Sequence, residues 1–73
     1  MELKKDRVLI ASDVSRDGIG IEVYRNDELL LEIFRNDHKK ERIVTIYKKE
    51  VSLDLIEESI ITFKKEIPWD FID

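Results

Sequence analysis

The sequence predicts an α+β domain, a four-stranded antiparallel β-meander with one C-terminal helix packed on one sheet face, in the order ββββα. Four segments between residues 7 and 47 alternate apolar and polar side chains with a period of two, as strands do. After Ser52 the apolar residues recur every three or four positions, as in an amphipathic helix. With 73 residues, we expect a single domain over 1–73, with 68–73 as a short C-terminal tail.

Period-two alternation defines the strand segments. Ile19, Ile21 and Val23 share one face of the second segment, and Leu31 and Ile33 share one face of the third. The first segment holds four consecutive apolar residues, so its pattern leaves open which side chains face the core. The four segments are Arg7–Ser12, Ile19–Tyr24, Glu28–Arg35 and Glu41–Tyr47.

The hairpin between the second and third segments predicts their register. A three-residue loop over 25–27 sets Val23 opposite Leu29. A five-residue loop would set Glu22 opposite Glu32, and like charges directly opposite destabilise a sheet. We therefore predict the shorter loop.

The next hairpin is predicted in the same way. A loop over 36–40 sets Ile33 opposite Ile43 and pairs Arg35 with Glu41, which have opposite charges. This register keeps one apolar face throughout the sheet, which we call the inner face because the helix should cover it. On the fourth segment it assigns to the inner face Ile43, Thr45 and Tyr47.

The helix has clear boundary signals. Ser52 is a favoured N-cap, Val51 and Ile56 stand at hydrophobic-staple positions, and Pro68 ends the segment. On this assignment Ile60→Asp should unfold the domain, while Leu55 and Ile61 lie away from the stripe. The predicted buried stripe is Leu53, Ile56, Ile60, Phe63 and Ile67.

Apolar side chains left on the opposite, outer face form the first candidate binding surface. A patch of this kind exceeds what a monomer usually exposes, unless the N-terminal residues or the tail cover it. On this assignment Phe34→Glu should leave the fold intact. The predicted patch consists of Tyr24, Leu30, Phe34, Val44 and Ile46.

The tail carries the second candidate. Trp69 and Phe71 lie beside two acidic residues, and they either anchor a partner or fold back to close the end of the core. For so small a domain, we favour closure of the core. We keep both aromatic residues as candidate partner-binding positions.

The segment 13–18 resembles the opening of a calcium loop. Asp13, Ser15 and Asp17 supply oxygens at positions 1, 3 and 5, and Gly18 follows. Position 12 should hold a bidentate glutamate and is Tyr24, so we predict no metal site. The preferred interpretation is a polar turn with Gly18 at positive φ.

A basic stretch lies within an acidic chain. Residues 35–49 hold six cations against two acids, a charge of +4, so the other residues carry −8 and the whole chain −4. Lys39, Lys40 and Arg42 are therefore candidates for weak nucleic-acid contact. We favour an ordinary solvated hairpin, because a globally acidic protein disfavours non-specific nucleic-acid binding.

The sequence offers little for catalysis or cofactor binding. His38 has neither a second histidine nor a nearby serine or cysteine, the carboxylates are scattered, and there is no glycine-rich phosphate loop. We predict a protein that is not an enzyme and needs no cofactor. The absence of cysteine and of a long apolar segment predicts a cytoplasmic protein of bacterial type with no membrane contact.

These features favour a small acidic module that binds a larger basic protein, such as an immunity protein or another inhibitor. A homodimeric structural or adaptor domain, associating through its outer sheet face, is the first alternative. Weak nucleic-acid binding through the hairpin 35–49 is the second. The sequence identifies no particular partner.

Overall fold

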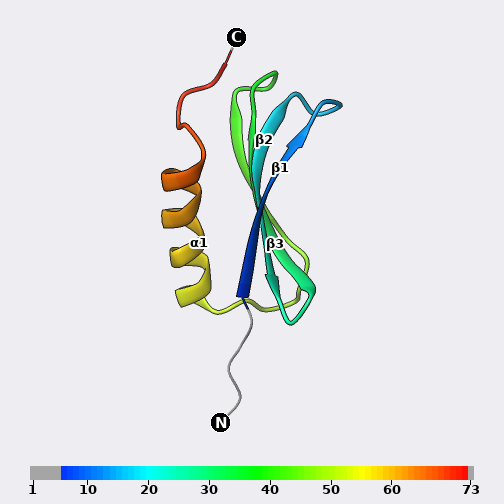
Figure 1. The fold of residues 1–73 in the computed structure, drawn as a ribbon, viewed down its shortest axis with the longest axis vertical. Helices are drawn as coiled ribbons and strands as arrows, with labels where there is room; N and C mark the ends of the chain where they lie inside the picture. Colours follow the sequence, from blue (N-terminus) through cyan, green and yellow to red (C-terminus); the bar gives the residue numbers. More distant parts are fainter. Residues whose placement is uncertain (1–5, 73) are drawn as a thin grey trace.

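The computed structural model describes residues 6–72 and confirms the predicted ββββα architecture (Figure 1). Four antiparallel strands form one open sheet in the order β1-β2-β3-β4, and one C-terminal helix packs against it. The ends of the predicted domain, residues 1–5 and 73, lie outside the described residues. The elements are β1 (Asp6–Asp13), β2 (Gly18–Arg25), β3 (Glu28–Asn36), β4 (Glu41–Ile46) and α1 (Leu53–Glu66).

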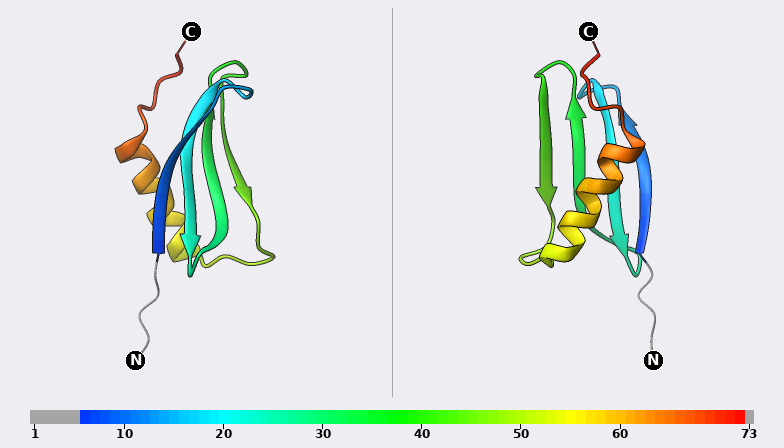
Figure 2. Two further views of the ribbon diagram at one scale, coloured as in Figure 1. Left: turned by 45° about the vertical axis from the view of Figure 1, so that its right-hand side comes forward. Right: turned by 90° about the vertical axis from the view of Figure 1, so that its left-hand side faces the viewer.

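The core lies between α1 and the two central strands. The helix crosses the inner face diagonally, so β1 and β4 lie at its two sides (Figure 2). The buried apolar cluster joins the inner face of β2 and β3 to α1 and the residue that follows it. It consists of Ile21, Val23, Leu30, Leu31, Ile33, Leu55, Phe63 and Ile67.

The β2–β3 register differs from the prediction. Arg25 pairs with Glu28 across a two-residue loop, and a bulge between Val23 and Tyr24, with Leu30 as the extra residue on β3, sets Val23 opposite Leu31. This places Glu22 opposite Glu32, the arrangement rejected above.

A residue from another loop explains this difference. Arg16, in the β1–β2 turn, donates two hydrogen bonds of 2.9 Å to the two carboxylate oxygens of Glu32. The bound cation offsets the repulsion between the two glutamates. The prediction considered only the residues of the two paired strands, so it did not include Arg16. The bulge also buries Leu30 in the core, where the prediction had placed it on the outer face.

The β3–β4 register is shifted by one residue, which turns β4 over. Asn36 pairs with Glu41 and Ile33 with Val44, so the loop is one residue shorter than predicted. Because strand side chains alternate between faces, Val44 and Ile46 lie on the inner face and Tyr47 on the outer one.

The same alternation orients β1. Val8 lies opposite Val23 and Ile10 opposite Ile21, so both face inward, while Leu9 and Ala11 face outward. The structure therefore settles the facing that the sequence pattern left open.

The bounds of α1 are confirmed, but its orientation is not. Ser52 caps the helix by accepting a hydrogen bond from the backbone N–H of Leu55, and the helix ends before Pro68. The buried helix residues are Leu55, Ser59 and Phe63, whereas Leu53 and Ile60 are exposed. The prediction omitted Ser59 as polar, but its hydroxyl donates to the Leu55 carbonyl oxygen and can therefore be buried.

Within residues 6–72, no helix combines the length and the apolar character needed to cross a membrane.

Candidate functional site

The exposed side of α1 combines apolar and acidic side chains. Leu53, Ile60 and Ile61 are 70%, 38% and 66% exposed. The span 50–58 contains four acidic residues and no basic residue. We call this surface the α1 ridge, and it comprises Leu53, Asp54, Glu57, Glu58, Ile60 and Ile61, all of which are exposed.

A pocket adjoins the α1 ridge on the β4 side. Its volume is about 140 Å³, and apolar side chains from β3, β4, α1 and the tail dominate its lining. Val44 and Ile46 on the inner face of β4 are both about half exposed. The pocket residues are Ile33, Arg42, Val44, Ile60, Phe63, Lys64 and Trp69.

We call this pocket, together with the half-exposed side chains of Val44 and Ile46, the α1–β4 groove. The C-terminal tail closes one end of the groove. The guanidinium of Arg42 lies 3.7 Å from the Trp69 ring centroid and 4.2 Å from that of Phe71. Arg42 Nη2 also donates a 2.6 Å hydrogen bond to the Trp69 carbonyl oxygen. The tail therefore folds back onto the domain, as favoured above, while Trp69 stays 48% exposed.

A buried ion pair holds the same tail. Arg35 Nε donates to Asp37 Oδ1 at 2.8 Å, and Arg35 Nη1 donates to the Pro68 carbonyl oxygen at 2.6 Å. The backbone N–H of Ile72 donates to Asp37. Burial opposes ionisation, but the hydrogen bonds from Arg35 and Ile72 still lower the pKa of Asp37 below its usual value. The predicted pair of Arg35 with Glu41 is wrong, because Asp37 and the tail bind Arg35 instead.

On the outer face, Phe34 is buried separately from the core cluster. It is only 2% exposed, and the guanidinium of Arg16 covers its ring at 3.8 Å. A Cβ at Gly18 would clash with the backbone carbonyl oxygen of Arg35 and would lie 2.8 Å from this ring, so the glycine allows the close approach of β3 and its Phe34 ring to β2. The side chain is unavailable to a partner.

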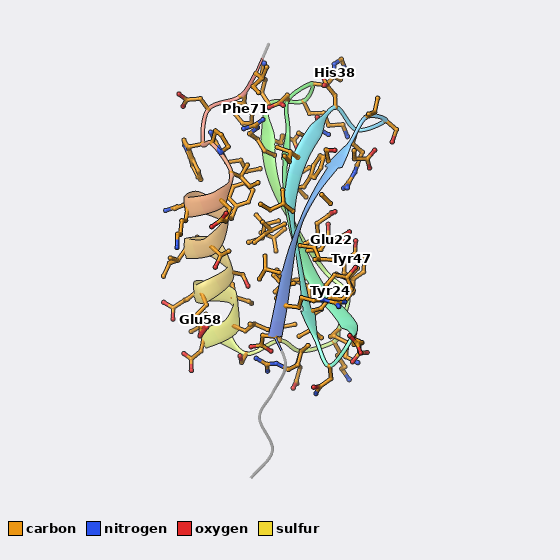
Figure 3. The ribbon with its side chains drawn as sticks, viewed as in Figure 1. Glu22, Tyr24, His38, Tyr47, Glu58 and Phe71 are labelled. Carbon is orange, nitrogen blue, oxygen red and sulfur yellow. The ribbon has the colours of Figure 1, made fainter. Side chains whose placement is uncertain are left out.

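The rest of the outer face carries polar and aromatic side chains beside apolar ones from the edge strands, such as Leu9. Glu22, Tyr24 and Tyr47 lie on the side of the sheet away from α1 (Figure 3). The Tyr24 hydroxyl donates a 3.2 Å hydrogen bond to Glu22, and desolvation together with that carboxylate raises the pKa of Tyr24. Tyr24 is thus the one member of the predicted patch that lies on the outer face and is partly accessible.

The 13–18 segment forms a closed polar turn. Asp13 Oδ1 accepts from the hydroxyl of Ser15 at 2.6 Å, and Oδ2 accepts from Arg16 Nε at 2.6 Å. These hydrogen bonds, that from Ser15 first, lower the pKa of Asp13 from 3.8 to about 2. Asp17, not Gly18, has the positive φ, at 56°. Among the described residues, no cluster of three His, Cys, Asp or Glu side chains could hold a metal ion.

The predicted nucleic-acid residues lie on the β3–β4 hairpin. Lys40 lies over the Phe71 ring at 5.9 Å, and Arg42 is stacked on the tail as described. Lys39 is exposed, and its backbone N–H donates a hydrogen bond to Asn36 Oδ1. His38 lies at the exposed tip of this hairpin, away from α1 (Figure 3).

The structure thus divides the predicted partner-binding residues between three places. Leu30 and Phe34 are buried, and Tyr24 lies on the outer face. The remaining four lie on the α1 side of β4 or in the tail: Val44, Ile46, Trp69 and Phe71. Comparison with known proteins finds no matching family, no similar curated protein and no similar solved structure.

Leu53 and Ile60 are the ridge residues that sequence reasoning assigned to the core. A signal was present: the helix has apolar residues at adjacent positions 55–56 and 60–61, which one stripe cannot bury. With apolar residues on two faces, the helix pattern alone does not say which face is buried.

Proposed function

We propose that this protein is a non-enzymatic binding module for a basic protein, which docks on the α1 ridge and the adjoining groove along β4. The observation that carries this proposal is the exposure of Leu53, Ile60 and Ile61 on a helix whose other apolar face already packs on the sheet. Several large apolar side chains exposed on one helix are typical of interaction sites.

Charge supports the choice of a basic partner. The exposed carboxylates of Asp54, Glu57 and Glu58 lie among these apolar side chains. A binding surface with apolar anchors and charges of one sign selects a partner with apolar side chains and the opposite charge. An inhibitor of a larger basic protein fits this description, and the absence of cysteine is compatible with action in the cytoplasm.

The test is affinity capture from the source cells with the tagged full chain, alongside Ile61→Lys and Leu53→Lys baits. We expect one protein of basic composition to be captured by the wild type and lost with both variants. Val14→Lys is the matched control, because Val14 is 95% exposed in the β1–β2 turn and lies outside the α1 ridge. Capture should also weaken as salt is raised, because salt screens exposed charges.

Two results would contradict the proposal. One is capture of a protein that binds the wild type and the Leu53→Lys and Ile61→Lys variants equally well. The other is recovery of nucleic acid that nuclease removes, which would favour the hairpin 35–49. Since the mutated side chains are exposed, circular dichroism should show that all three variants fold.

A further inference from the structure

The two edges of the open sheet are unlike. The β4 edge has six residues, includes Glu41 and Arg42, and is followed by Lys48 and Lys49. Charges of this kind discourage pairing with another strand. The β1 edge has eight residues, and between Arg7 and Asp13 it carries no charge.

The middle of β1 is apolar and accessible on both faces. Val8 and Ile10 on the inner face and Leu9 on the outer face are each 40% exposed or more. In an edge strand, alternate backbone N–H and C=O groups point away from the sheet and can pair with a further strand. This is therefore a strand-pairing edge without the usual protection.

We propose that β1 pairs antiparallel with β1 of a second copy, joining two sheets into one of eight strands around a two-fold axis at Ile10. Arg7 and Asp13 are equidistant from Ile10 and lie on the same face, the outer one. Pairing centred on Ile10 therefore sets Arg7 of each copy opposite Asp13 of the other copy, so two such pairs form. Opposite charges directly across two strands stabilise their pairing. This charge complementarity makes a second copy the occupant.

Backbone geometry restricts the register. The backbone groups that point away from the sheet occur at every second residue of an edge strand. Two residues that pair through these groups are therefore separated by an even number of positions along β1. The two-fold axis must then pass through a residue and not between two residues. An axis at Leu9 would set Arg7 opposite Ala11 and Asp6 opposite Ser12, so it would make no ion pair among the described residues of β1. The axis at Ile10 gains two ion pairs and sets the two Ile10 side chains against each other.

Both partners of the ion pair are available. Arg7 is 54% exposed, 3.7 Å from Asp27 and 5.0 Å from the Tyr24 ring centroid. Asp13 Oδ2 accepts one hydrogen bond from Arg16, and a carboxylate oxygen has about two acceptor sites. Because β1 and β4 are opposite edges, pairing leaves the α1–β4 groove open, and this inference stands or falls independently of the proposed function.

The chain contains no cysteine, so single-cysteine variants report the register directly. Under mild oxidation, Ile10→Cys should form a disulfide-linked dimer, and the neighbouring Leu9→Cys should not. Sedimentation of the unmodified chain should show a concentration-dependent dimer. Arg7→Glu should weaken dimerisation by about tenfold, because each of two ion pairs becomes a repulsion. Lys49→Glu, the matched charge change beyond the opposite edge, should leave it unchanged.

A single monomeric species at all concentrations would overturn the inference. So would a dimer that is cross-linked by Leu9→Cys but not by Ile10→Cys, or one that Arg7→Glu leaves intact. Ile10 is 54% exposed, so its substitution should preserve the fold, and circular dichroism checks this directly.

Discussion

Two arginines stack on aromatic rings on opposite faces of the sheet, and their surroundings differ. On the outer face, Arg16 covers the buried ring of Phe34 and binds the carboxylates of Glu32 and Asp13. On the inner face, Arg42 covers the half-exposed ring of Trp69 and binds its carbonyl oxygen. We call these the outer stack and the inner stack.

The difference shows how a single helix can suffice for a sheet with two faces. The helix already covers the centre of the inner face, so the inner stack only closes one end of the groove beside it. In the described part of the chain no helix covers the outer face, and there the side chain of Arg16, from the β1–β2 turn, covers Phe34 instead. The outer stack should therefore contribute more to stability than the inner stack.

The largest expected effect is at Phe34. Phe34→Ala should lower the free energy of unfolding by about 3–5 kcal/mol, because it removes a buried aromatic ring. A protein of this length has about 4–11 kcal/mol in total. Urea denaturation followed by circular dichroism measures the change.

The same reasoning reverses two expectations from the sequence. Phe34→Glu should now unfold the domain, and Ile60→Asp should leave it folded, because Ile60 is exposed. A folded Phe34→Glu variant would show that the outer stack is peripheral and that the comparison is wrong.

The next effect is at Arg16. Arg16→Ala should cost about 2–3 kcal/mol, because it leaves the carboxylate of Glu32 buried without its cation. Glu32 has a side chain only 7% exposed. Adding Glu32→Gln should recover part of the loss, since the buried charge is then absent. If the double variant is no more stable than Arg16→Ala, the ion pair is not the source of the effect.

A smaller effect is expected in the inner stack. Arg42→Ala should cost about 1 kcal/mol, the contribution of an accessible cation–π contact. Trp69 is the sole tryptophan, so its fluorescence should shift toward that of a solvated indole. Arg42→Lys is the control, because it keeps the charge but loses the planar stack. Its stability should lie between those of the wild type and Arg42→Ala. A loss equal to that of Arg16→Ala would remove the contrast between the stacks.

The smallest effect concerns acid stability through Asp13. Its pKa is about 2 in the folded protein against 3.8 ordinarily, so its contribution is full above about pH 4 and is lost as the pH falls toward 2. Asp13→Asn should therefore flatten the fall in urea midpoint between pH 4 and 2. An unchanged slope would show that the Asp13 carboxylate, which binds Arg16 of the outer stack, does not contribute to the pH dependence of stability.

The sequence by itself determined the elements, and it predicted each strand boundary to within one residue. Local signals are sufficient for these: period-two alternation for the strands, the Ser52 cap at the start of α1 and Pro68 after its end. Such signals involve residues within a few positions of each other, so they act before any tertiary contact forms. The order of the four strands in the meander followed from the short connections between them.

The sequence also predicted the buried faces of β2 and β3, but only the tertiary structure decided which face β1, β4 and α1 bury. Glu22 can stand opposite Glu32 because Arg16 binds Glu32, and the β3–β4 loop is one residue shorter than expected, with Arg35 bound to Asp37 and the tail. In a strand, a register shift of one residue moves every side chain to the other face. In α1, a rotation about the helix axis by one residue position or less changes which side chains are buried. The contacts that accompany these choices join residues as many as 33 positions apart, beyond what a local pattern contains.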